Sequence, residues 1–535
     1  MAFLVNRPPC ALFEDEDLLV AHKPAGWNTH APHPHAGEGI HDWLRHREPR
    51  WASLAILHRL DKETSGVLVF GRTTAANRSL TRQFTERTVR KNYVLMTERA
   101  PKSENFTVRS RLVRTGDRYA VSADKSRGEL AETRFSLLKH EGGRFWLEAE
   151  PVTGRTHQIR VHAADRGVPV LGDSLYGGGP APRLCLHARR VEFRHPRTNE
   201  TVVFEVEPDF SADPAEAWRA ACIEPAETNA CRLVHGAADG WPGWYVDRLG
   251  DFLLSQGEAP PGEGQTRHLH DLLERQGLAG AYDKRWTRHV RGKGAMEASP
   301  GWLFGKRAPF EFEARENGVR YALRLGEGYS VGLFLDQRDN RRRFLTGYVA
   351  GGFELFPGGA RGAEVLNTFA YTCGFSVCAA LGGARATSLD LSRKYLDWGR
   401  RNFELNGLKP DEHDFIHGDA LDWMRRLAKK GRRFDAVVLD PPTFSQSKRS
   451  GVFKADRNYG ALVEAALPLL KSGGVMLAST NAAELKPERF LGMARDAVQS
   501  ANRRILREHY VPQPPDFPVA REEPAHLKTV WLRVE

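Results

Sequence analysis

The stretch His58-Arg59-Leu60-Asp61-Lys62-Glu63-Thr64-Ser65-Gly66 decides the fold of the first part of this chain. It places a carboxylate beside cationic side chains, between two apolar runs at residues 54–57 and 67–70. Short, continuous apolar runs of this kind are typical of buried strands. We therefore expect the core to hold the turn between them rigidly, so that Asp61 can act as a nucleophile.

Two further segments follow in the order that a known enzyme family requires. They are Lys91-Asn92-Tyr93 and Gly154-Arg155-Thr156-His157-Gln158-Ile159-Arg160-Val161-His162. Together with the stretch around Asp61, they resemble the signature motifs of the RluA family of RNA pseudouridine synthases. The resemblance covers residues up to about 210 and implies an α+β fold with a mainly antiparallel sheet.

The resemblance also implies a chemistry. Such enzymes break the C1′–N1 bond of a uridine, rotate the uracil and rejoin it through C5 without a cofactor. Asp61 would attack C1′ or remove a sugar proton, and the sequence leaves both routes open. Arg160 would pair with this carboxylate and keep it ionised, while Tyr93 would stack on the uracil. Apart from the motifs, a surface ion pair and a core aromatic would be the simpler interpretations of these two residues.

Composition indicates a multidomain globular protein with an anionic partner. The chain has 535 residues, too many for one ordinary core, with 41% hydrophobic and 27% charged residues. Its net charge of +11 favours RNA, although a solvated basic surface is the simpler alternative. No apolar run is long enough to cross a bilayer and the first residues do not resemble a secretion signal, so we expect a cytoplasmic protein.

Cysteine and histidine usage argues against a metal. The six cysteines are scattered without CxxC pairs, which predicts reduced thiols. Five early histidines lie among Pro and Gly residues, which indicates a loop and no metal site: His30, His33, His35, His41 and His46. His58 and Arg59 are expected to support the turn and contact phosphates rather than to carry protons.

Changes in pattern along the chain predict its domains. Residues 1–212 alternate as short strands, with a helical stretch at 73–84, and form the synthase domain. Residues 213–230 lose this alternation and are interpreted as a linker with room for two helical turns at 215–221. A small α+β subdomain is expected at 231–345. From 346 to 535, strands, glycine turns and amphipathic helices alternate, which is typical of a doubly wound, Rossmann-like sheet.

This last region carries a second set of candidate site residues. A strand at 364–368 passes through a turn of small residues into a helix, a geometry that brings main chain close to a cofactor. A second strand ends in Asp390, suited to ribose hydroxyls, and Asp419 can bind an adenine amine. A fourth strand ends in Asp440-Pro441-Pro442-Thr443-Phe444. A nucleotide-binding fold without catalysis is the alternative, but the rigid Pro-Pro turn favours an extruded base.

Residues 231–535 resemble class I S-adenosylmethionine-dependent methyltransferases, and specifically those of large-subunit rRNA. The segment Phe334-Leu335-Asp336-Gln337-Arg338 and the Asp-Pro-Pro-Thr-Phe-Ser turn carry this resemblance. It implies S-adenosylmethionine as cofactor. The residues implied to bind it are Arg338, Asn367, Phe369, Tyr371, Gly374, Asp390, Asp419 and Asp440. Those implied to hold the methyl-acceptor base are Pro441, Pro442 and Phe444.

Two positions depart from the pattern of this family. Cys373 stands where a second glycine is common, and Asn367 where many relatives have Asp. We expect the side chain of Cys373 to narrow the approach to the methionine moiety. Loss of a carboxylate at 367 would remove one partner of the cofactor's cationic end. A methyltransferase with weakened cofactor binding is therefore an open alternative.

The acceptor atom is constrained by the cysteines. Methylation at C5 of a pyrimidine requires a thiolate that adds to C6, yet no cysteine follows Cys378. A purine nitrogen already carries a lone pair and requires only proximity to the methyl donor. The sequence after Asp440 looks most like relatives that methylate guanine N7, which we favour over cytosine C5.

These observations predict a bifunctional RNA modification enzyme that isomerises a uridine and methylates a base, most plausibly in 23S rRNA. The main alternative is a ribosome-assembly or RNA-binding factor with an active synthase and a degenerate methyltransferase. Methylation of a protein is a poorer third hypothesis, because an RNA-directed synthase would be an odd companion for it.

Overall fold

The computed structural model describes residues 7–124, 126–286, 299–328, 330–447 and 451–535. Contacts between residues divide the chain into two units. The first contains residues 1–32, 38–45 and 53–223, and the second contains residues 33–37, 46–52 and 224–535. No helix in the described ranges is long and apolar enough to cross a membrane.

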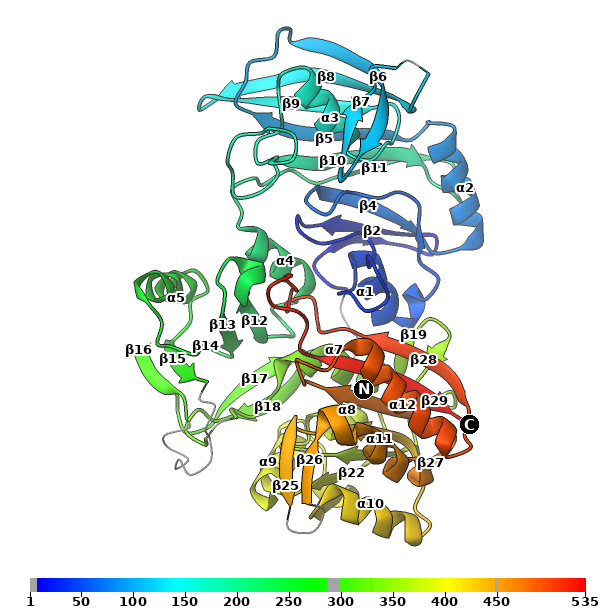
Figure 1. The fold of residues 1–535 in the computed structure, drawn as a ribbon, viewed down its shortest axis with the longest axis vertical. Helices are drawn as coiled ribbons and strands as arrows, with labels where there is room; N and C mark the ends of the chain where they lie inside the picture. The colour runs from blue at the N-terminus through cyan, green and yellow to red at the C-terminus, as the bar shows by residue number, and fades with distance from the viewer. Residues whose placement is uncertain (1–6, 125, 287–298, 329, 448–450) are drawn as a thin grey trace. The chain divides into compact units, whose positions relative to one another are not determined.

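The first unit is built on one large, mainly antiparallel sheet (Figure 1). Its order is β1-β2-β4-β10-β5-β9-β8-β6-β7, with β11 paired to β10 and β3 paired to β4. The strands are β1 (Ala11–Glu14), β2 (Leu18–Lys23), β3 (Ala55–Ile56), β4 (Ser65–Gly71), β5 (Arg90–Thr97), β6 (Asn105–Thr115), β7 (Arg118–Val121), β8 (Glu129–Glu141), β9 (Arg144–Pro151), β10 (Leu186–Arg194) and β11 (Thr201–Glu205). The expected α+β class is confirmed.

Helices and the ends of strands position the first site. The helices in this part of the chain are α1 (Ile40–Arg47), α2 (Thr74–Thr85), α3 (Gln158–Asp165) and α4 (Pro214–Cys222). Every residue of β4 is buried, as expected for an apolar strand inside a sheet. The prediction of a second buried strand at 54–57 was wrong in extent. Only Ala55 and Ile56 pair with β4, because Leu57 turns away to line a cavity.

Helix α4 lies within the expected linker at residues 213–230, but it belongs to the first unit. The two helical turns predicted at 215–221 do form. The ring of Trp218 stacks on Trp27, with centroids 5.6 Å apart, and the main-chain N–H of Cys10 donates to the carbonyl of Ala221 at 3.0 Å. These contacts tie α4 to the first two strands.

The second unit begins with a five-stranded sheet of order β12-β13-β14-β15-β16, followed by a β17–β18 hairpin. Helix α5 crosses over between the parallel strands β14 and β15 and packs its leucines on one face. The elements are β12 (Ala230–His235), β13 (Trp244–Leu249), β14 (Phe252–Gly257), α5 (Glu263–Arg275), β15 (Gly280–Arg285), β16 (Gly301–Gly305), β17 (Phe312–Glu316) and β18 (Val319–Leu323).

A seven-stranded sheet of order β23-β22-β21-β24-β27-β29-β28 forms the rest of this unit. Its first five strands are parallel, β29 is antiparallel to β27, and β28 is antiparallel to β29. The strands are β21 (Glu364–Thr368), β22 (Arg385–Asp390), β23 (Asp414–His417), β24 (Phe434–Leu439), β27 (Leu470–Thr480), β28 (Ile505–Val511) and β29 (Lys528–Val534). The strand order reverses between β21 and β24, and ligands of such sheets bind at the carboxyl ends beside this point.

Helices cover both faces of this sheet, which confirms the predicted doubly wound fold. Figure 1 shows α11 and α12 together beside β27 and β29. The helices are α7 (Arg338–Thr346), α8 (Gly374–Leu381), α9 (Arg393–Leu405), α10 (Ala420–Lys429), α11 (Ala455–Ala466) and α12 (Pro487–Ser500). Short hairpins join β19 (Tyr348–Ala350) to β20 (Phe353–Glu354), and β25 (Phe444–Ser447) to β26 (Gly451–Lys454). Residues alternate along the strands, so Val365 joins one core and Leu366 the other.

Candidate active sites

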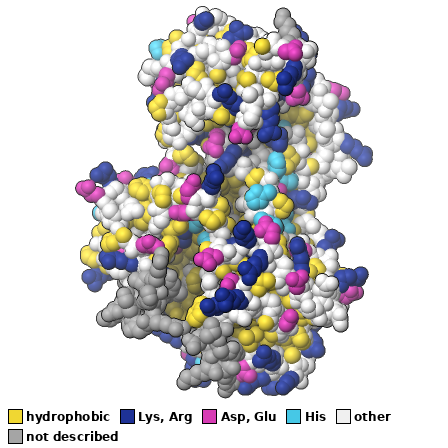
Figure 2. Space-filling view, viewed as in Figure 1, with side chains coloured by type: hydrophobic (Ala, Val, Ile, Leu, Met, Phe, Trp, Pro, Cys, Tyr) yellow, Lys and Arg dark blue, Asp and Glu magenta, His cyan; other side chains and the backbone are white. Residues whose placement is uncertain are grey.

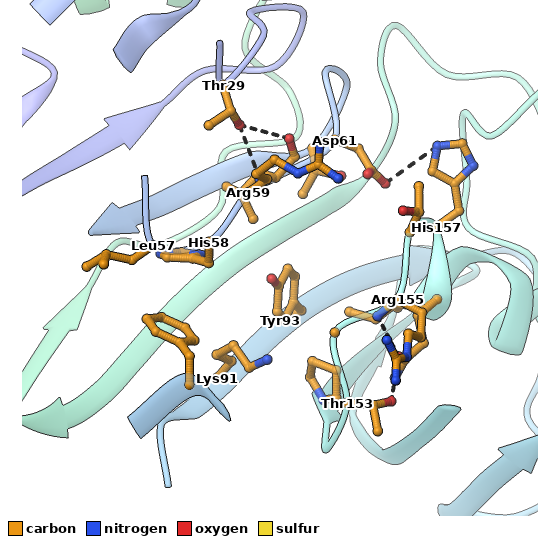
Figure 3. Close-up of a pocket in the computed structure, with 18 of the residues that line it drawn as sticks. Thr29, Leu57, His58, Arg59, Asp61, Lys91, Tyr93, Thr153, Arg155 and His157 are labelled. Carbon is orange, nitrogen blue, oxygen red and sulfur yellow. Dashed lines mark hydrogen bonds and ion pairs between the residues drawn. The ribbon is translucent and has the colours of Figure 1, made fainter. Parts of the chain in front are cut away.

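A cavity of about 890 Å³ in the first unit is lined by all three residues predicted to be catalytic there. Figure 3 shows two of them, Asp61 and Tyr93. Asp61 lies in the loop between β3 and β4, Tyr93 on β5 and Arg160 on α3. The loop that joins β9 to α3 closes the opposite wall with Thr153 and Arg155. Sequence segments about 100 residues apart thus meet around one carboxylate.

The loop that carries Asp61 is fixed by a buried lysine that sequence reasoning missed. Lys23 ends β2, is fully buried and donates to three main-chain carbonyls, including Trp27 at 2.7 Å and Lys62 at 2.8 Å. Burial lowers the pKa of Lys23 to about 7. On the other side, the hydroxyl of Thr29 donates to the carbonyl of Leu60 at 3.0 Å. A lysine at the end of the mainly apolar strand Leu18–Lys23 was the signal that could have found it.

Arg160 is held chiefly by Asp173, a residue that the sequence analysis did not single out. Its guanidinium makes a bidentate pair with that carboxylate, with Nε–Oδ2 at 2.7 Å and Nη2–Oδ1 at 2.8 Å. Its Nη1 lies 3.7 Å from Oδ2 of Asp61. Burial alone would lower the pKa of Arg160, but Asp173 raises it overall, so the guanidinium stays charged. The expected pairing with Asp61 is therefore present but longer, and a second carboxylate orients it.

His157 also lies beside the carboxylate of Asp61. The main-chain N–H of Tyr119 donates to the hydroxyl oxygen of Tyr176 at 2.9 Å, and that hydroxyl lies 2.8 Å from Nδ1 of His157. Because the hydroxyl oxygen already accepts from Tyr119, its proton is available for donation to Nδ1, and in that arrangement the neutral imidazole carries its proton on Nε2. Nε2 lies 3.9 Å from Oδ2 of Asp61 (Figure 3). Burial lowers the pKa of His157, which favours this neutral form.

Two other aromatic groups of the cavity are neutral. The N–H of Val69 donates to Nε2 of His58 at 3.1 Å, and the imidazole stacks on Phe84. Burial lowers the pKa of His58 to about 3, in keeping with the structural role expected for it. Burial and the charge of Asp61 raise the pKa of Tyr93, so its phenol keeps its proton.

A second cavity, of about 440 Å³, lies at the carboxyl ends of β21, β22 and β24. The predicted residues that line it are Phe369, Tyr371, Asp390, Asp419, Asp440, Pro441 and Pro442. The carboxylate of Asp390 accepts the N–H groups of Tyr371 and Ser392, both at 2.8 Å, and is thereby fixed at the end of β22. Its remaining lone pairs can accept ribose hydroxyls, and the main-chain turn and acids fit a nucleoside cofactor.

The turn before α8 corrects the expectation for Cys373. Three residues adopt left-handed main-chain conformations, namely Phe369, Tyr371 and Cys373, with φ of 55°, 49° and 62°. This alternation points the sulfur of Cys373 away from the cavity and against α9. A Cβ placed on Gly399 of α9 would lie 2.3 Å from that sulfur. The side chain is fully buried, so the prediction that it narrows the cofactor approach was wrong.

Four residues predicted for this site lie outside the cavity lining. Arg338 is buried in a bidentate pair with Asp516, at 2.7 and 2.6 Å, because the first turn of α7 faces the loop after β28. The amide of Asn367 donates to the hydroxyl of Ser376 inside the sheet–helix interface. Gly374 lies against Arg341, and Phe444 is half-exposed beyond the Pro-Pro turn.

Asp336, to which the sequence analysis assigned no role, lies at the far end of this cavity. His526 lies 3.1 Å from Oδ2 of Asp336. Burial would raise the pKa of Asp336, but His526 and nearby arginines lower it overall. Burial, reinforced by the charge of Asp336, raises the pKa of Asp440 to about 7. Gln337 and Asn481 also line this end. All six cysteines are buried, and none of the described residues lining this cavity is a cysteine.

These two arrangements define two classes of catalyst in one chain. Asp61, with an arginine and a neutral tyrosine in one cavity, defines a base-handling isomerase that uses no cofactor. Acids at the ends of successive parallel strands define a Rossmann-like transferase with a nucleoside cofactor.

Comparisons with known proteins agree with both. A family model described as RNA pseudouridylate synthase matches residues 17–165, and one described as S-adenosylmethionine-dependent methyltransferase matches residues 231–533. The chain belongs to the S-adenosylmethionine-dependent methyltransferase family and also carries an RNA pseudouridylate synthase domain. Its methyltransferase cofactor is S-adenosylmethionine.

The chain is also similar to curated proteins and to solved structures. The chain is similar to ribosomal RNA large subunit methyltransferase I of Klebsiella pneumoniae strain 342, with 31% identity over 72% of this chain and 90% of the relative. The protein of the same name from Escherichia coli strain SMS-3-5 is 32% identical over 58% of this chain and 76% of its own length. The crystal structure of SMU.776 complexed with SAH is 28% identical, with a TM-score of 0.51, covering 60% of this chain and 79% of that one.

Proposed function

We propose that this chain modifies large-subunit rRNA twice, isomerising one uridine in the first unit and methylating one base, favoured at guanine N7, in the second. The convergence of Asp61, Tyr93 and Arg160 on a single cavity carries the first half of the proposal. Lys and Arg side chains lie over the visible surface of both units, mixed with acids (Figure 2). The net charge of +11 supports a polyanionic partner but does not indicate where on the surface that partner binds.

For the isomerisation, the target uridine leaves its stack and enters the cavity of the first unit. The carboxylate of Asp61 attacks C1′ or removes a sugar proton as the base departs, and either route needs it ionised. Arg160 supplies the adjacent positive charge, and Asp173 keeps that charge in position. The neutral phenol of Tyr93 offers a stacking face and a proton donor.

For the methylation, Asp390 and Asp419 would hold the ribose and the adenine of S-adenosylmethionine. When bound, that cofactor supplies an electrophilic methyl group. Asp440, Pro441 and Pro442 would orient the acceptor base at the other end of the cavity. The absence of a thiol among the described lining residues supports a nitrogen acceptor, because carbon methylation at C5 of a pyrimidine needs a thiolate.

Mass spectrometry of rRNA from a strain that lacks the gene tests both halves. One pseudouridine and one methylated base should be missing, and the mass and fragmentation of the latter distinguish guanine N7 from cytosine C5. Complementation with Asp61→Asn should restore only the methyl mark, and Asp440→Ala only the pseudouridine. Loss of both marks from either variant would contradict two independent sites.

A further inference from the structure

Lys91 lies on the floor of the synthase cavity, on the same face of β5 as Tyr93. The two residues are two positions apart, so their side chains leave the strand on one side, and both line the cavity that contains Asp61 (Figure 3). The ammonium reaches across to the loop before α3, where a Cβ placed on Gly154 would lie 3.8 Å from Nζ.

Lys91 is a cation without a counter-charge in the described structure. Among the described residues, none forms a hydrogen bond or ion pair with it, whereas two arginines of the same cavity are engaged. Arg160 is bound to Asp173, and Arg155 to Glu129 at 2.8 Å. Burial lowers the pKa of Lys91. An uncompensated, largely buried charge is costly, which indicates that an anion completes the site during function.

The reaction itself generates such an anion. When the C1′–N1 bond breaks, its electron pair stays with the base, and the detached uracil carries a negative charge shared by its ring and its two carbonyl oxygens. This holds whether Asp61 bonds to C1′ or takes the sugar proton. After rotation, C5 bonds to C1′, the C5 proton leaves and N1 gains a proton. The charge on the base is therefore transient and exists only between cleavage and rejoining.

We propose that Lys91 is a further catalytic residue, whose ammonium donates to a uracil carbonyl oxygen and stabilises the departing base. This deepens, and rests on, the isomerase activity proposed above. A contact with an RNA phosphate is the competing role. It suits Arg59 and Arg87 better, because those side chains are exposed at the cavity rim, whereas Lys91 lies beside Tyr93 at the floor.

Single-turnover kinetics with Lys91→Met test this role. The substrate is large-subunit rRNA from a strain that lacks the gene, with enzyme in excess, and conversion is followed by mass spectrometry. We expect the rate at saturating enzyme to fall about 100-fold, as for the loss of one electrostatic donor, while RNA affinity changes less than about threefold. The matched control is Arg90→Met, which removes an exposed cation one position earlier on β5 and should leave both values unchanged.

A pH profile separates catalysis from mere structural support. The parent rate should decline at alkaline pH as the ammonium is lost, and the Lys91→Met rate should lack that decline. An intact rate with RNA affinity lowered tenfold or more would overturn the proposal in favour of a phosphate contact. Unchanged rate and affinity would overturn it outright. If Lys91→Met fails to fold, as judged by thermal unfolding, Lys91→Gln replaces it. Absence of pseudouridine formation by the parent protein would instead refute the isomerase function.

Discussion

Nε2 of His157 lies 3.9 Å from Oδ2 of Asp61, while its Nδ1 contacts the hydroxyl of Tyr176 at 2.8 Å. The carboxylate of Asp61 therefore faces two donor groups from one segment of chain, this imidazole and the guanidinium of Arg160. The hydroxyl of Tyr176 contacts the far nitrogen of the imidazole, and Asp173 holds the guanidinium. Each donor is thus oriented by a group that does not touch Asp61.

Removal of the tyrosine hydroxyl should release this imidazole. Tyr176→Phe leaves Nδ1 of His157 and the N–H of Tyr119 without their partner, so the Nε2–H form is no longer favoured. We expect isomerisation to slow about tenfold, which corresponds to one modest hydrogen bond. Single-turnover kinetics measure this. An unchanged rate would show that the tautomer of His157 does not matter.

Replacement of Cys373 should leave cofactor binding intact. Its sulfur lies against Gly399, away from the cavity, so Cys373→Gly removes nothing that the cofactor contacts. We expect the Kd for S-adenosylmethionine, from calorimetry, to change by less than about threefold, or about 0.6 kcal/mol. Asp390→Ala serves as the positive control and should weaken binding clearly. Tighter binding by Cys373→Gly would restore the idea that this side chain obstructs the site.

The buried carboxyl group of Asp440 should lower the free energy of unfolding at neutral and alkaline pH. Burial raises the pKa of Asp440 from 3.8 to about 7, so between these values the unfolded chain releases a proton that the folded protein keeps. Stability attributable to this group therefore falls as pH rises through that window and is constant above it. Asp440→Asn should increase the free energy of unfolding by up to about 4 kcal/mol at pH 8 and by only about 1–2 kcal/mol at pH 5.

Denaturant titration at the two pH values checks this expectation. The control is Asp411→Asn, which removes a fully exposed carboxylate and should not alter the free energy of unfolding. If Asp440→Asn increased the free energy of unfolding equally at pH 5 and pH 8, the raised pKa of this buried acid would be contradicted.

Truncation of Trp218 should destabilise the first unit. Its ring stacks on the buried Trp27 and lies against Gly26, which has a left-handed φ of 84° and donates its N–H to the carbonyl of Lys62, in the loop that carries Asp61. Trp218→Ala should cost about 2–3 kcal/mol, less than for a fully buried tryptophan because part of the ring is exposed. Thermal unfolding measures this. No change would mean that α4 is an accessory segment, as the linker interpretation assumed.

The sequence predicted the fold classes well because both follow from local periodicity. The helix expected at 73–84 formed within one residue of that position, at Thr74–Thr85. Motif residues with a fixed spacing, such as Asp61 and Tyr93, also meet as expected. These features depend on neighbours along the chain, which a single sequence displays directly.

The partners of those residues could not be predicted in the same way. Asp173 and Asp516 are ordinary acids in loops, and only the folded chain shows that they hold Arg160 and Arg338. The direction of the Cys373 side chain follows from a left-handed main-chain angle that residue type does not reveal. Ion pairs between distant residues and left-handed main-chain conformations are thus the parts of the site that the sequence could not predict.

The alternation along β5 has a consequence for how this enzyme can diverge. Lys91 and Tyr93 both face the cavity because they are two positions apart on the strand, with one residue between them. A single residue inserted or deleted between them would move one of the two side chains to the opposite face of the sheet. In this stretch of β5, substitutions can therefore preserve the site, whereas insertions and deletions cannot.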